Sequence, residues 1–326
     1  MYLKTEILSC NKEGTFRAAQ ILNEGGLVAF PTETVYGLGA DSTNIEAVEK
    51  IYKAKRRPKY NPLIIHVFNL EKAREFVEMD SKASKLAESF WPGPLTLVLE
   101  HKADQNLKIT PRALSKLNTV GIRVPIHPVA REILSLCNNP IAAPSANLSG
   151  KLSTTRFEDV LECLSGKVNA IVDGGPCPIG VESTIVRIEY GNVSILRPGK
   201  ITVKDIKAKI GETQKPDVNN KPISAPGQLS SHYCPDTPIR LNVLTPKDNE
   251  LLLAFGPLPV GVRGLSLSEI FDPDEAAMNL YSALADLDHL AKITKCNSIA
   301  INPIPASGVG AAIIDRLRRA AYRSQK

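Results

Sequence analysis

The sequence predicts an α/β protein with an open, twisted, mixed sheet and helices, followed by a smaller Rossmann-like α/β domain. Helical and strand patterns alternate over the first 200 residues, which is typical of α/β folds. A polar stretch with repeated prolines and little periodicity then runs to about residue 238. At 326 residues the chain is also longer than one hydrophobic core usually serves. We therefore expect a first domain at 1–200, a linker at 201–238 and a second domain at 239–326.

Apolar residues at the spacing i, i+3, i+4 predict two helices early in the chain. The first pattern comprises Ala18, Ile21 and Leu22, and the second comprises Val48, Ile51 and Tyr52. Gly25 and Gly26 supply a stop for the first helix. Pro58 ends the second, because the residue before a proline is disfavoured in a helix.

Short apolar runs bounded by turn residues predict the strands of the first domain. These runs are 27–30, 63–67, 95–99, 120–124, 141–143, 170–173 and 183–188. In the second domain, 251–255 and 298–301 read as buried strands. Two helix faces are predicted there: Leu280, Leu284, Leu287 and Ala291, and then Ile313, Leu317, Ala320 and Ala321.

The composition is that of a globular protein that can bury packed cores. Hydrophobic residues make up 43% and charged residues 23% of the chain. The net charge of +6 arises from interspersed acidic and basic residues, which favours an anionic ligand without indicating a nucleic-acid groove.

The six cysteines lie far apart without metal-ligand spacing, so we expect reduced thiols and neither a zinc site nor a disulfide scaffold. No apolar run reaches the roughly 18 residues needed to cross a bilayer, and no signal-peptide core begins the chain. These patterns predict a soluble cytoplasmic protein.

Two segments combine groups that could hold a polar ligand. Residues 31–39, PTETVYGLG, follow a predicted strand and would form a loop with hydroxyls, a carboxylate and two flexible glycines. The alternative is a turn whose threonines only satisfy backbone groups. The cations Lys55 and Arg57, with Asn61 behind them, suit a polyphosphate, although cations at a helix end also complement the helix dipole.

Other candidate residues lie in or beside predicted strands. His66 lies inside an apolar strand, where a lone histidine is usually a core residue. Thr119 and Arg123 alternate along another strand, so Arg123 could hold a carboxylate or form a surface ion pair. The small residues of 142–150 would allow a ligand close approach or form a plain turn. Segment 181–186 begins a strand with two hydroxyls, and 196–199 ends one with an exposed cation.

Taken in order, these segments resemble the threonylcarbamoyl-AMP synthase family, the YrdC-type enzymes, in its long two-domain form. The resemblance runs over nearly the whole chain. The motifs are PTETVYGLG from Pro31, KRRP from Lys55, WPGPLT from Trp91, GIRVP from Gly121, PSANLSG from Pro144, ESTIV from Glu182 and LRPG from Leu196. Several ordered motifs coincide by chance far less often than any one of them.

The resemblance implies a YrdC-like sheet with a basic cavity for L-threonine and ATP. The implied L-threonine contacts are Thr34, His66, Arg123, Ala143 and Ser183, with Arg123 facing the substrate carboxylate. The implied ATP contacts are Arg57, Asn61, Thr119, Ser145, Ser153, Arg197 and Tyr233. Lys55, Arg57, Ser145 and Asn147 match the tetrad associated with activity.

The implied reaction joins bicarbonate and the threonine amine into a carbamate, whose oxygen attacks the ATP α-phosphorus and expels pyrophosphate. Positioning and charge neutralisation by Lys55, Arg57 and Arg197, helped by Mg²⁺, would lower the barrier. No covalent nucleophile and no tightly bound organic cofactor are implied. The product would pass to a threonylcarbamoyl-transferase complex that modifies tRNA.

The family's lid over the nucleotide is also implied, at Pro226-Gly227 and 232–235. The family's basic residues between these two parts are replaced here by the sequence Gln228-Leu229-Ser230-Ser231.

Two alternatives remain at this stage. A non-catalytic RNA-binding module would use the basic sheet for phosphates, but aromatic residues make up only 5% of the chain and do not interleave with its cations. A carbamoyl-transfer enzyme that shares the domain would need acylphosphatase-like and zinc-finger segments, which the sequence lacks.

Overall fold

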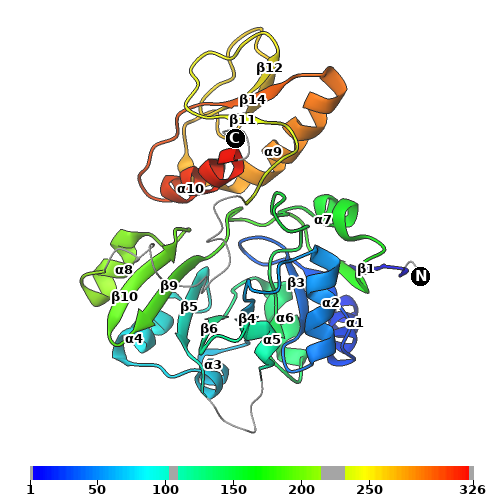
Figure 1. Ribbon diagram of the computed structural model, residues 1–326, viewed down its shortest axis with the longest axis vertical. Coiled ribbons are helices and arrows are strands. Elements are labelled where there is room, and N and C mark those ends of the chain that lie inside the picture. The colour runs from blue at the N-terminus through cyan, green and yellow to red at the C-terminus, as the bar shows by residue number, and fades with distance from the viewer. Residues whose placement is uncertain (1–2, 103–108, 214–231, 323–326) are drawn as a thin grey trace.

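The structure, a computed structural model, describes residues 3–102, 109–213 and 232–322. It contains a large N-terminal domain and a small C-terminal domain that lie one above the other along the long axis (Figure 1). Each domain has its own sheet with helices packed on it. The predicted α/β class with a second, smaller domain is therefore confirmed.

The first domain is built on a ten-stranded mixed sheet with the order β1-β8-β2-β3-β7-β4-β6-β5-β9-β10. The sheet contains parallel pairs, such as β4 with β6, and antiparallel pairs, such as β5 with β6. The strands are β1 (Glu6–Ser9), β2 (Val28–Phe30), β3 (Gly37–Asp41), β4 (Ile64–His66), β5 (Leu95–Glu100), β6 (Thr119–Arg123), β7 (Ile141–Ala142), β8 (Ala170–Asp173), β9 (Thr184–Glu189) and β10 (Asn192–Arg197).

Helices pack against this sheet and build separate apolar cores with it. The helices are α1 (Lys12–Asn23), α2 (Ile45–Lys55), α3 (Leu70–Phe76), α4 (Ser81–Phe90), α5 (Pro111–Leu114), α6 (Pro128–Leu136), α7 (Phe157–Leu164) and α8 (Val203–Ile210). One core joins α1 and α6 to strand residues such as Phe30 and Val172. The larger core includes Ile51 of α2, Leu86 of α4 and Ile206 of α8.

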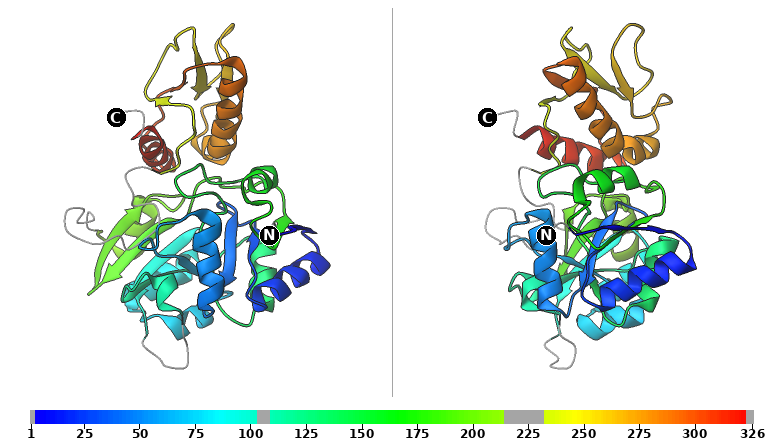
Figure 2. Two further views of the ribbon diagram at one scale, coloured as in Figure 1. Left: turned by 45° about the vertical axis from the view of Figure 1, so that its right-hand side comes forward. Right: turned by 90° about the vertical axis from the view of Figure 1, so that its right-hand side faces the viewer.

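The second domain has a parallel four-stranded sheet with the order β11-β14-β12-β13. Its elements are β11 (Ile239–Arg240), β12 (Glu250–Ala254), β13 (Gly264–Ser266), α9 (Pro273–Thr294), β14 (Ser298–Ile301) and α10 (Gly310–Ala321). Asp272 caps α9 by accepting a hydrogen bond from Asp274 N. In both views of Figure 2, α9 and α10 lie next to the first domain.

Two local expectations were wrong. Residues 37–39 belong to strand β3 and not to a loop, and neither Gly37 nor Gly39 has a positive φ. A Cβ at Gly39 would lie 2.7 Å from Phe30 Cε1, so this glycine permits close packing and supplies no flexibility. The stretch read as lacking periodicity contains α8, whose Ile206 is fully buried in the first domain.

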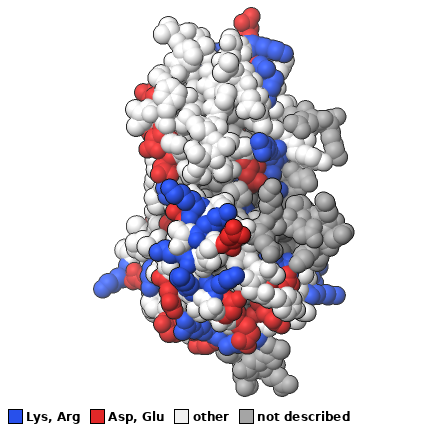
Figure 3. All heavy atoms as spheres, turned by 90° about the vertical axis from the view of Figure 1, so that its left-hand side faces the viewer, with Lys and Arg blue, Asp and Glu red and all other residues white. Residues whose placement is uncertain are grey.

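The surface carries both signs of charge. On the face in Figure 3, Lys and Arg side chains intermix with Asp and Glu over the first domain. Across the described ranges, no helix is long and apolar enough to span a membrane. Four arginines lie inside the molecule instead, since Arg57, Arg123, Arg197 and Arg316 are all buried.

Candidate active site

A small cavity of about 40 Å³ lies where β3, β4, β6 and β10 of the first domain meet the segments 182–183 and 232–233. Every residue predicted to contact L-threonine lines it: Thr34, His66, Arg123, Ala143 and Ser183. Arg57, Ser145, Arg197 and Tyr233 of the predicted ATP set line it as well. Residues from distant parts of the chain therefore meet at one place.

Backbone geometry at the end of α2 turns two cations inward. Arg56 takes the left-handed conformation with φ of 51°, so Lys55 and Arg57 are buried while Arg56 is exposed. Arg57 donates to the carbonyls of Asn61 at 3.1 Å and Pro62 at 2.8 Å. These contacts hold its guanidinium at the cavity.

Lys55 does not line the cavity but binds the loop that contains Ser145 and Asn147. Its Nζ donates to the carbonyls of Ser145 and Asn147, and it lies 3.3 Å from Asn147 Oδ1. Burial, and then the nearby charge of Arg57, lowers the pKa of Lys55 to about 7. Ser145 Oγ donates to Asn147 Oδ1 at 2.5 Å, so Lys55, Ser145 and Asn147 of the predicted tetrad form one connected network around the loop.

Arg123 forms a buried ion pair beside the cavity. Its Nη2 lies 2.5 Å from Glu33 Oε1, and its Nη1 donates to Thr34 Oγ1 at 2.9 Å. Its Nε is buried and has no hydrogen-bond partner among the described residues. Burial, followed by the charge of Arg123, lowers the pKa of His66 to about 3, so this imidazole is neutral at physiological pH.

Arg197 was expected to be exposed, but the structure buries it at 3% exposure. Its Nε and Nη2 donate to the carbonyl of Ser183 at 3.1 and 2.9 Å. Its Nη2 also donates to Ser183 Oγ at 3.1 Å. The β9–β10 pair brings these residues together, because Arg197 ends β10 close to the start of β9. Burial lowers the pKa of Arg197 from its ordinary value.

Tyr233 and His232 close one side of the cavity. Tyr233 is 2% exposed and has a φ of 63°, which L residues adopt rarely. The volume of the cavity is about 40 Å³. Of the other predicted lid residues, Cys234 and Pro235 line a different cavity, and 226–231 lie outside the described residues.

Five predicted residues do not line this cavity: Lys55, Asn61, Thr119, Asn147 and Ser153. Asn61 lies beside it with a buried Oδ1 that has no partner in the described ranges. Thr119 is half-buried at the start of β6. Sequence reasoning missed Glu33 and Glu182 as structural partners, although both lie inside recognised motifs.

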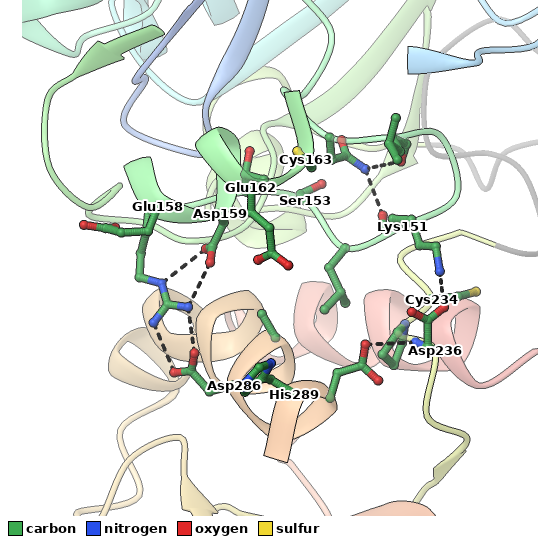
Figure 4. A pocket seen from close by; sticks show the side chains of 18 of the residues that line it. Lys151, Ser153, Glu158, Asp159, Glu162, Cys163, Cys234, Asp236, Asp286 and His289 are labelled. Atoms are coloured by element: carbon green, nitrogen blue, oxygen red, sulfur yellow. Dashed lines mark hydrogen bonds and ion pairs between the residues drawn. The ribbon is translucent and has the colours of Figure 1, made fainter. Parts of the chain in front are cut away.

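A second, larger cavity of about 680 Å³ lies between the domains, and Asn147 and Ser153 line it (Figure 4). Glu158, Asp159 and Glu162 come from α7 on one side, and Asp286 and His289 come from α9 on the other. Arg156 spans the gap, since its Nη2 lies 2.9 Å from Asp159 Oδ1 and 2.8 Å from Asp286 Oδ1.

Comparisons with known proteins agree with this arrangement. A family model described as telomere recombination (Sua5, YciO, YrdC) matches residues 20–199. A second one, described as the threonylcarbamoyl-AMP synthase C-terminal domain, matches residues 201–322.

Full-length relatives match as well. The chain is 41% identical to threonylcarbamoyl-AMP synthase of Bacillus subtilis, covering 97% of this chain and 95% of that protein. It is 40% identical to the Pyrococcus abyssi protein of the same name, covering 94% of each. The crystal structure of P. abyssi Sua5 complexed with L-threonine matches with a TM-score of 0.87 and 35% identity, covering 97% of this chain and 98% of that chain.

Proposed function

The chain belongs to the threonylcarbamoyl-AMP synthase family, and from this premise we propose how its cavity joins L-threonine, bicarbonate and ATP. Its activity is that of a nucleotidyltransferase that forms threonylcarbamoyl-AMP for tRNA modification. The observation that carries the proposed site is the meeting of Arg57, Arg123, Ser145 and Arg197 in one cavity. Cations and hydroxyls gathered in one place suit a triphosphate beside an amino acid.

L-Threonine occupies the part of the cavity around Arg123. The unpartnered Nε of Arg123 supplies a donor for the substrate carboxylate. Thr34 and Ser183 add hydroxyls, and the methyl of Ala143 leaves room for a close approach. His66, being neutral, adds hydrogen bonding without a second positive charge.

ATP lies against Arg57 and Arg197, with Asn61, Thr119, Ser145, Ser153 and Tyr233 as further contacts. The backbone carbonyls that fix both guanidiniums preorganise their charge before the phosphates arrive. Lys55 acts through the loop that it holds, since it orients Ser145 and Asn147.

The threonine amine adds to bicarbonate with loss of water, which gives a carbamate. A carbamate oxygen then forms a bond to the α-phosphorus as the bond to the pyrophosphate oxygen breaks. Mg²⁺ would enter with ATP, because Mg²⁺ is commonly held by substrate phosphates. The protein's own contribution is position and positive charge.

The product is a mixed anhydride, so it must be consumed by an acyl transfer to a nucleophile. We assign that step to a threonylcarbamoyl-transferase complex acting on tRNA in the cytoplasm. Neither the transfer complex nor the compartment is needed for the reaction itself.

The direct test is mass detection of threonylcarbamoyl-AMP after mixing the protein with ATP, Mg²⁺, bicarbonate and threonine. Pyrophosphate release should depend on threonine and on bicarbonate. Pyrophosphate release that is the same without threonine would contradict the proposal, and so would failure to detect threonylcarbamoyl-AMP by mass.

Variants at two cavity cations test the site. Lost charge-assisted hydrogen bonds of about 1.5–3 kcal/mol predict that Arg57→Ala and Arg123→Ala each lower kcat/KM by roughly 10- to 150-fold. Arg131→Ala is a matched control, because Arg131 lies over the Phe68 ring away from the cavity. Unchanged release in both cavity variants would remove the site assignment while leaving the activity in place.

A further inference from the structure

The C-terminal domain contributes two buried polar side chains to a carboxylate of the first domain. Tyr281 of α9 donates its hydroxyl to Glu182, 3.0 Å from both Oε1 and Oε2. Arg316 of α10 donates its Nε to Glu182 Oε2 at 2.8 Å. The Arg316 side chain is 1% exposed and that of Glu182 is 7% exposed, so the contact is shielded from water.

Glu182 lies between residues of the proposed site. It directly precedes Ser183, and its Oε1 accepts a hydrogen bond from Ser153 Oγ at 2.5 Å. Arg316 makes a second contact through Nη2, which donates to the carbonyl of Pro198 at 3.0 Å. Pro198 directly follows Arg197, so one guanidinium joins the start of β9 to the end of β10.

The same side chains hold the ring of Tyr233. The Arg316 guanidinium carbon lies 5.5 Å from the centroid of that ring. The Tyr233 and Tyr281 ring centroids are 5.7 Å apart. Tyr233 therefore rests on the C-terminal domain while it closes the cavity of the first.

The electrostatics favour an ionised Glu182. Burial alone raises the pKa of a carboxyl group, but the charges of Arg316 and Arg197 and the hydrogen bond from Ser153 outweigh it and hold the pKa of Glu182 at about 2. Burial, followed by the charge of Glu182, raises the pKa of Tyr281 well above its ordinary value, so its hydroxyl stays a donor. Removing Arg316 would leave a buried carboxylate without its cation, which is unfavourable.

We propose that Arg316 and Tyr281 are positioning residues for the synthase reaction, which they serve by fixing Glu182, the backbone beside Arg197 and the Tyr233 ring. The C-terminal domain thereby completes the active site without touching the reacting atoms. Through Glu182 it sets Ser153 and Ser183, and through Pro198 it sets Arg197. This inference rests on the proposed function of the cavity.

The test compares kcat, KM and the pH profile of Arg316→Met in the full-length chain with those of Arg318→Met. Arg318 is exposed on the same helix, so its variant controls for the chemical change. We expect Arg316→Met to lower kcat by about 10- to 100-fold, because small displacements of positioning groups have effects of that size. The acid limb of its pH profile should move to higher pH, because an unpaired buried carboxyl group has a raised pKa.

Removing the stranded charge should restore part of the loss. The double variant Arg316→Met/Glu182→Gln should recover activity relative to Arg316→Met and lose the displaced acid limb. Tyr281→Phe, which strands no charge, should lower kcat several-fold at an unchanged melting temperature. If Arg316→Met fails to fold, the double variant and Tyr281→Phe decide the question.

The outcomes separate this inference from the proposed function. Wild-type protein that forms no threonylcarbamoyl-AMP overturns both. Active wild-type protein, with Arg316→Met and Tyr281→Phe as active as Arg318→Met, overturns the inference alone. The same holds for an acid limb that stays in place in Arg316→Met.

Discussion

Backbone carbonyls orient two of the arginine side chains that line the cavity. Arg57 donates to the carbonyls of Asn61 and Pro62, and Arg197 donates to that of Ser183. Carbonyl oxygens orient a guanidinium without neutralising its positive charge, as the contacts of Arg57 show. Glu182 differs, because its carboxylate is balanced by Arg316 of the other domain. Each charged side chain at this site therefore has its own kind of partner, either backbone carbonyls or an opposite charge.

Glu182 makes a prediction about stability and pH. Its pKa is about 2 in the folded protein and 4.5 in an unperturbed glutamate, so the ionised carboxylate stabilises the fold above about pH 4.5. That contribution, on the order of 3 kcal/mol, should be lost as the pH falls from about 4.5 toward 2. Urea unfolding of wild type and Glu182→Gln at pH 7, 4 and 3 measures it, and their difference should shrink on acidification.

Glu158→Gln is the matched control for this measurement, because Glu158 is exposed on α7. The difference between wild type and Glu158→Gln should stay small at each pH. A Glu182→Gln difference that is constant from pH 7 to pH 3 would show that the carboxylate is not held ionised by its partners.

Apolar periodicity predicted the helices and strands whose buried residues form a pattern within one short stretch of sequence. The patterns at Ala18, Ile21 and Leu22 and at 63–67 correspond to α1 and β4, since both bury one contiguous set of side chains. The sequence did not predict strand β3, because its glycines resemble turn residues. Their packing against Phe30 is a contact between strands, which no local pattern shows. The sequence also did not predict the partners of Glu182. Arg316 lies 134 residues away, and no local pattern marks such a pair.

The turn after β10 gives a prediction at the scale of elements. A Cβ at Gly199 would lie 2.5 Å from Thr184 N and 2.7 Å from Glu182 O, and both are backbone atoms of the neighbouring segment. Gly199→Ala should push the end of β10 away from β9 and cost about 1–3 kcal/mol of stability. Because Arg197 moves with that segment, pyrophosphate release should fall as well.

Gly121→Ala provides the comparison for stability. A Cβ at Gly121 would lie 3.5 Å from Thr96 Cγ2, which is an ordinary van der Waals contact. Thermal unfolding should therefore show a clearly lower Tm for Gly199→Ala than for Gly121→Ala. Equal values of Tm would mean that the turn relaxes freely and that its glycine is not required for packing.

The two domains form one functional body because they share an apolar core as well as the Glu182 contacts. Val35 and Val181 of the first domain pack in the same cluster as Leu280 and Tyr281 of α9. In contrast, the two main cores of the first domain contain only residues up to 210. The first domain thus has what it needs to fold, while its cavity depends on Tyr233 of the linker and on Tyr281 and Arg316 of the second domain.

Truncation separates these two dependencies. A chain that ends before Pro226 should keep the cooperative thermal unfolding of the first domain, with a lower Tm because Val35 and Val181 become exposed. Its pyrophosphate release should fall far more than its stability, because the residues that close the cavity and hold Glu182 are gone. Circular dichroism melting and threonine-dependent release, measured beside the full chain, give both quantities. A truncated chain with full activity would show that the first domain binds and aligns both substrates alone, and the role proposed for the C-terminal domain would then be wrong.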